Sequence, residues 1–109
     1  MTKRLFFGLL AVATLSAAPA GRTFIGTITD SVCAKGGHSQ MQMGPTDAAC
    51  TIACVDLHGA SYVLLDGKDV YALSDQRTPE KFAGKKVKVI GTLDGKTKTI
   101  QVESITPAK

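Results

Sequence analysis

The sequence lacks the residue patterns that mark several large functional classes. It has no pair of acidic residues spaced for general acid–base work, no phosphate loop and no dinucleotide fingerprint. The Cys-x-x-Cys spacing of thioredoxin-like enzymes and zinc knuckles is also missing. A cysteine, a histidine and a carboxylate (Asp30 or Asp56) are present by type, but no spacing supports a nucleophile set. We therefore expect a binding protein rather than an enzyme.

No hydrophobic run is long enough to cross a bilayer, which takes about 20 residues. The apolar stretch Leu5–Leu15 is shorter, two basic residues precede it, and Ala18 and Ala20 follow in the positions of an A-x-A cleavage site. This order is typical of a secretory signal peptide. We expect a cleaved signal peptide over residues 1–20 and a secreted or periplasmic mature chain, residues 21–109, with no membrane span.

The mature chain carries little excess charge. Two of the 13 basic residues lie in the signal peptide, so 11 remain against nine acidic residues, a net charge of +2. This balance does not indicate a nucleic-acid partner, and export makes one still less expected. We expect an envelope or extracellular partner of unknown identity. Within the densest basic run, Lys86 and Lys88 alternate with Val87, which indicates the solvated face of a strand.

Cysteine is scarce, and its number is odd. All three cysteines belong to the mature chain, where an oxidising compartment allows at most one intramolecular disulfide. The remaining thiol would be free, bound to a metal or paired with another chain. A domain of this size buries a thin core and often depends on a disulfide or a metal ion for stability.

Alternating hydrophobicity and turn signals predict a mostly β domain. The strands are expected at residues 23–29, 62–65, 70–73, 86–93 and 97–102, with a helix over about 46–58 and a short helical turn over about 79–83. Asp66-Gly67 and Asp94-Gly95 are typical of hairpin turns. Residues 30–44 lose periodicity and are expected to form a long loop.

The order of these elements favours an OB-like fold, a small, partly open five-stranded barrel with a short helix between its third and fourth strands. Gly26 and Gly91 are placed to bend strands at barrel corners. A five-stranded meander packed on one helix is the competing arrangement. We predict a small five-stranded OB-like barrel with the helix 46–58 inserted after the first strand.

That helix carries two of the cysteines on one expected face. Cys50, Ala53, Cys54 and Leu57 follow the spacing i, i+3, i+4 and i+7, which predicts a buried stripe with both cysteines pointing inward. Neighbouring thiolates one turn apart suit a single ion. Cys33 and His38, from the preceding loop, would complete a Cys₃His set, which is a known zinc arrangement.

A second set of candidate ligands suits copper. His38 with Met41 and Met43 offers imidazole and thioether ligands, which suit Cu(I) in exported proteins. The two methionines can equally be apolar anchors of the loop. The cofactor, if there is one, is thus expected to be a zinc or copper ion.

Two further interpretations need no ion. A disulfide from Cys33 to Cys50 or Cys54 would close a loop of about 15–20 residues and stabilise the fold by about 3 kcal/mol. The protein would then be a stapled interaction module. Alternatively, the third cysteine allows disulfide exchange, and Cys50 lies near a helix N-terminus, where the dipole favours a thiolate. That arrangement would give a thiol-redox protein.

Four segments together resemble a family of small secreted bacterial proteins of unknown function. They are GTITDSVC (26–33), CTIACV (50–55), GASYVLLDGKDVYAL (59–73) and FAGKKVKVIGTL (82–93). The resemblance implies export, an OB-like β-domain and a pattern of Asp-Ser-x-Cys, a downstream His and Cys-x-x-x-Cys. The matching positions are Asp30, Ser31, Cys33, His38, Cys50 and Cys54. Many relatives carry glycine after the first cysteine, where this chain has Ala34. The resemblance implies no activity.

Overall fold

The computed structural model describes residues 21–36 and 45–108. The elements are β1 (Arg22–Asp30), α2 (Cys33–Gly36), α3 (Asp47–His58), β2 (Tyr62–Asp66), β3 (Asp69–Leu73), the 3₁₀ helix η2 (Thr78–Phe82), β4 (Lys86–Asp94) and β5 (Thr99–Pro107). The signal peptide predicted over residues 1–20 lies outside the described residues, as do His38, Met41 and Met43. Within the described part, every helix is too short or too polar to cross a membrane.

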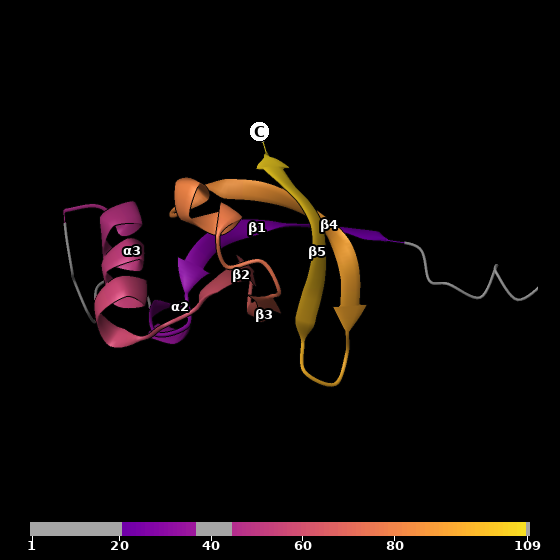
Figure 1. The fold of residues 1–109 in the computed structure, drawn as a ribbon, viewed down its shortest axis with the longest axis horizontal. Helices are drawn as coiled ribbons and strands as arrows, with labels where there is room; N and C mark the ends of the chain where they lie inside the picture. The colour runs from indigo at the N-terminus through magenta and orange to yellow at the C-terminus, as the bar shows by residue number, and fades with distance from the viewer. Residues whose placement is uncertain (1–20, 37–44, 109) are drawn as a thin grey trace, which may run out of the picture.

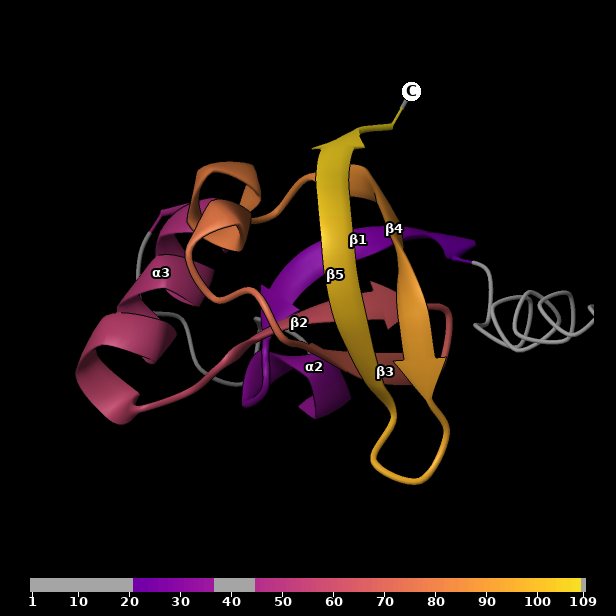
Figure 2. The same ribbon diagram turned by 45° about the vertical axis from the view of Figure 1, so that its right-hand side comes forward.

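The five strands close into a ring in the order β1-β2-β3-β5-β4, with β4 pairing back onto β1 (Figure 2). All neighbouring strands are antiparallel except β3 and β5, which run parallel through the pairs Ala72↔Thr99 and Leu73↔Ile100. A meander would place β3 beside β4, so this pairing rules that arrangement out. The predicted OB-like barrel is confirmed.

Two glycines allow the strands to approach closely. A Cβ atom on Gly91 would overlap the backbone carbonyl of Gln101, and one on Gly26 would overlap that of Leu65. The register between β4 and β5 shifts at Ile90/Gly91, the kind of irregularity that bends a strand at a barrel corner. The expected bend is confirmed at Gly91, whereas Gly26 is shown only to allow the close approach of β1 to β2.

The core fills the inside of the ring, mainly with side chains of the strands. Its buried members are Phe24, Ile28, Tyr62, Leu64, Leu73, Ala83, Val87, Val89, Ile100 and Ile105. Lys86 and Lys88 are exposed and alternate with the buried Val87 and Val89 of β4, as predicted. Phe82 at the end of η2 is half-buried and packs against this core.

The structure differs from the predicted elements after β1. Asp30, expected at the start of a loop, ends β1, and a short helix follows from Cys33 instead of an irregular segment. The Asp30 carboxylate causes this turn, because its Oδ2 accepts the backbone N–H groups of Val32 and Cys33, each at 3.0 Å. Strand β5 also continues to Pro107, five residues beyond its predicted end, because it pairs with the full length of β4.

Helix α3 lies beyond the end of β1, next to α2 (Figure 1). Its ends follow the sequence signals. The Thr46 hydroxyl accepts the N–H of Ala49 at 3.1 Å, and Gly59 ends the helix in the left-handed conformation at φ 69°. Helix α3 therefore begins and ends where its caps predict, and this placement brings it opposite α2.

Candidate metal centre

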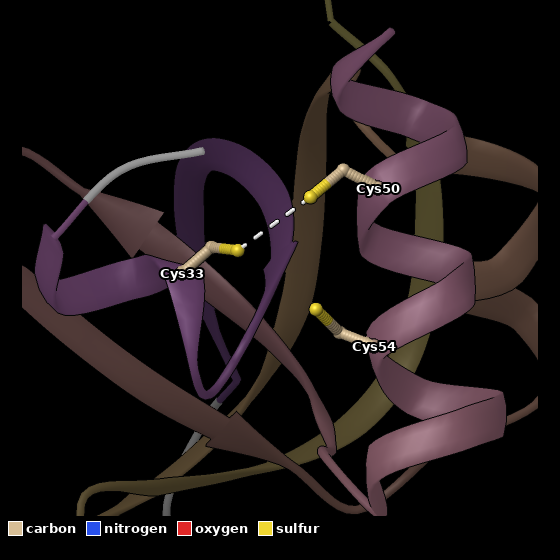
Figure 3. Close-up of side chains that lie close together, drawn as sticks. All are labelled: Cys33, Cys50 and Cys54. Carbon is tan, nitrogen blue, oxygen red and sulfur yellow. Dashed lines mark hydrogen bonds between the residues drawn. The ribbon is translucent and has the colours of Figure 1, made fainter. Parts of the chain in front are cut away.

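Three cysteine side chains converge between α2 and α3. Cys33 points from the first turn of α2 towards α3, and Cys50 and Cys54 point from α3 into the same space (Figure 3). The three sulfur atoms all lie within 4.8 Å of one another. The Sγ atoms of Cys33 and Cys50 are 3.8 Å apart, and the structure has no disulfide among the three.

All three thiols are buried, with exposed fractions of 3%, 1% and 0% for Cys33, Cys50 and Cys54. The predicted inward stripe of α3 is confirmed for the two cysteines but wrong for Leu57, which is 70% exposed. The buried residues of α3 are Cys50, Thr51 and Cys54, all in its first eight positions. The last turn extends past the packed part of the helix, so Leu57 has no neighbouring element to cover it among the described residues.

Backbone contacts fix the turn that carries Cys33. Besides the two bonds to Asp30, the N–H of Ser31 donates to the carbonyl of Ser61 at 2.8 Å, and the Ser31 hydroxyl accepts the N–H of Ser61 at 3.0 Å. Asp30 therefore caps this turn, and Ser31 joins it to Ser61 through its backbone N–H and its hydroxyl group. These contacts tie α2 to the start of β2, so the position of Cys33 relative to α3 is set by the barrel.

Burial raises the pKa of the Cys33 thiol well above its usual range, and the neighbouring Asp30 carboxyl group raises it further. The pKa of Cys54 is also raised, first by burial and then by the charge of Asp30. Without an ion these two thiols are therefore protonated at neutral pH. A metal ion that bound them would have to displace protons.

The Asp30 carboxyl group is itself an unusual feature of this site. It is 0% exposed, and while Oδ2 accepts two backbone N–H groups, Oδ1 is buried with no hydrogen-bond partner among the described residues. The ligand sets predicted from the sequence did not include Asp30. The Asp-Ser-x-Cys spacing could have indicated that Asp30 belongs to the site, because it places this carboxylate three residues before Cys33.

The sulfur geometry approaches that of three thiolates on one ion. A tetrahedral zinc ion with bonds of about 2.3 Å to sulfur holds its thiolate ligands about 3.8 Å apart. The distance between the sulfurs of Cys33 and Cys50 equals this value, and the other sulfur pairs lie within 4.8 Å. The structure thus brings together three of the four residues in the predicted Cys₃His set, while His38 lies outside the described residues.

Comparison with known proteins gives a family without an assigned activity. Residues 55–108 match the model of a family described as a protein of unknown function (DUF5818). No curated protein and no solved structure matches the chain. The matched segment runs from the last third of α3 to the end of β5, so the Asp-Ser-x-Cys and Cys-x-x-x-Cys pattern precedes it. Over its C-terminal half, the chain is therefore similar to an uncharacterised family.

Proposed function

We propose that this protein is a secreted or periplasmic metal-binding protein that holds one thiophilic ion, Zn²⁺ or Cu(I), between α2 and α3. Cys33, Cys50 and Cys54 supply three thiolate ligands, and His38 is the expected fourth ligand. The observation that carries the proposal is the mutual approach of three buried sulfur atoms within 4.8 Å, contributed by two separate helices.

An ion in this site would also stabilise so small a domain. An ion held by Cys33 on one side and by the two α3 cysteines on the other would link α2 to α3 at the end of β1. Metal binding to preformed ligands in the folded state adds directly to folding stability. The thin core of the ring would gain a cross-link without a disulfide.

Burial argues against thiol exchange with another protein. A redox cysteine needs a lowered pKa and access to its partner, whereas Cys33 and Cys54 are buried and their pKa values are raised. The second candidate is a disulfide-stapled interaction module for an envelope or extracellular partner. It is favoured by the 3.8 Å between the sulfurs of Cys33 and Cys50, which a small shift would close.

Non-denaturing mass spectrometry separates these candidates. The protein is purified from an oxidising, exported compartment without chelator or reductant. Metal binding predicts a chain with all three thiols reduced and one stoichiometric ion, which Cys33→Ser and Cys54→Ser both lose. Ala53→Ser is the matched control, because it adds the same hydroxyl to α3 and removes no sulfur. A chain lighter by two hydrogens and without an ion would refute metal binding and support the stapled module.

A further inference from the structure

We infer that Asp30 makes the three-cysteine site selective for a divalent ion such as Zn²⁺ over monovalent Cu(I). The inference rests on the proposed metal-binding function and narrows the ion that the site takes. Asp30 acts as a positioning residue and as a carboxylate beside the ligands.

The first observation is the unpartnered oxygen. A buried carboxylate oxygen without a hydrogen bond costs free energy, so its presence calls for a compensating partner. Asp30 cannot turn Oδ1 towards solvent without losing the bonds that Oδ2 accepts from Val32 and Cys33, both 3.0 Å long. Its side chain is therefore held in place beside the Cys33 thiol, and Oδ1 has no hydrogen-bond partner of good geometry among the described residues.

The second observation is that no cation among the described residues offsets this group. Among the side chains that the structure describes, the ion pair found joins Lys98 to Asp69 on the surface, and none involves Asp30. The Asp30 charge instead acts on Cys33 and Cys54, two of the proposed ligands. A positive ion among the three sulfurs would be the compensating partner that the described residues do not supply.

Charge then distinguishes the two classes of ion. Three thiolates and the Asp30 carboxylate bring four negative charges to one buried region. Cu(I) would leave three of them uncompensated, and a divalent ion would leave two. Because Coulomb attraction scales with the charge of the ion, Asp30 attracts Zn²⁺ with twice the energy that it attracts Cu(I). The lower the local dielectric, the larger this difference becomes.

The assigned role is not that of a direct ligand. Among the described residues, the group of ligand atoms within 4.8 Å of one another consists of the three sulfurs, and no Asp30 oxygen belongs to it. Carboxylates in the shell behind the ligands still tune metal sites, and their loss typically lowers metal affinity by about 10–100-fold. Asp30 is placed to do this in two ways, through its charge and through the turn that holds Cys33.

The test compares Zn²⁺ and Cu(I) affinities of the full chain by competition with chromophoric chelators, for the wild type and for Asp30→Asn. Asparagine keeps a side-chain oxygen for the N–H groups of Val32 and Cys33 and removes the charge. We expect Zn²⁺ affinity to fall by about 10–100-fold and Cu(I) affinity to fall clearly less. Asp69→Asn, which removes an exposed carboxylate far along the chain, should change neither affinity.

The outcomes are distinguishable. If Asp30→Asn lowers the Zn²⁺ and Cu(I) affinities equally, Asp30 only positions Cys33. If it changes neither affinity, Asp30 has no role in binding. Either result overturns the inference that Asp30 favours a divalent ion. A wild-type chain that binds neither ion would instead overturn the proposed function. If Asp30→Asn does not fold by circular dichroism, Asp30→Ser, which also offers a capping oxygen without charge, replaces it in the same comparison.

Discussion

Zinc should raise the thermal stability of this protein through the three cysteines, by an amount that the binding equilibrium sets. An ion that binds only the folded state stabilises it by about 2.7 kcal/mol when present at 100 times its Kd. For a domain of this size, each kcal/mol shifts Tm by roughly 4–8 °C. Saturating Zn²⁺ is therefore expected to raise Tm by roughly 10–20 °C.

The assay is a thermal melt of the reduced protein at increasing free Zn²⁺, followed by circular dichroism. Cys54→Ala is the decisive variant, because Cys54 is 0% exposed and contributes one of the three converging sulfurs. The Tm of this variant without metal is compared with its Tm in Zn²⁺, so the destabilisation that the substitution itself causes does not enter the comparison. The zinc-dependent shift should fall to a small fraction of the wild-type value in this variant.

Two results would refute the reasoning. If Zn²⁺ leaves the wild-type Tm unchanged, the three thiols do not bind the ion in the folded state. If Zn²⁺ shifts the wild type and Cys54→Ala equally, the ion binds elsewhere on the chain. Ala53→Ser serves as the control on the same helix and should retain the full shift.

Three further predictions concern the barrel itself. Gly91→Ala should lower the free energy of unfolding in urea by about 1–3 kcal/mol, because the added Cβ overlaps the carbonyl of Gln101; an unchanged midpoint would contradict the close approach. Gln76→Ala should lower the free energy of unfolding by about 1–3 kcal/mol in the same assay. The reason is that the Gln76 amide makes three hydrogen bonds of 2.9–3.0 Å, which join β2 to the end of β3. A decrease below a few tenths of a kcal/mol would contradict that role. The pKa of Asp75 is lowered, chiefly by hydrogen bonding to Thr78, from its ordinary value of 3.8. The stabilising contribution of the Asp75 carboxylate is therefore complete above that value and is lost as the pH falls through the folded-state pKa. Asp75→Asn should reduce the loss of stability that the wild type shows below about pH 4. Identical stability curves for the wild type and the variant would show that Asp75 contributes nothing.

Local signals in the sequence were sufficient to predict most of the elements. Asp66-Gly67 predicts the first hairpin, and the strands pair through Asp66↔Asp69 around a two-residue turn. Thr46 and Gly59 predict the ends of α3 to within one residue. These features depend on a few neighbouring backbone groups, so short stretches of sequence contain all the information that they need.

The candidate site was predicted only in part. The inward direction of Cys50 and Cys54 followed from helical periodicity, but the same periodicity placed Leu57 on the buried face, where it is 70% exposed. Periodicity identifies which residues share a face and not how far along the helix the packing extends. The convergence of Cys33 on those two cysteines was proposed as one of several possibilities and was decided by the turn at Asp30.

By itself, the sequence determined the strand count, the hairpins, the helix and its caps, and the two cysteines on one helical face, because each depends on contacts within a few residues. Only the tertiary structure decided the parallel pairing of β3 with β5, the closure of the ring and the burial of Asp30 beside three thiols. Those features join segments far apart in the chain. They depend on which apolar surfaces of distant segments are buried against one another, and this is a property of the whole fold and not of any short pattern.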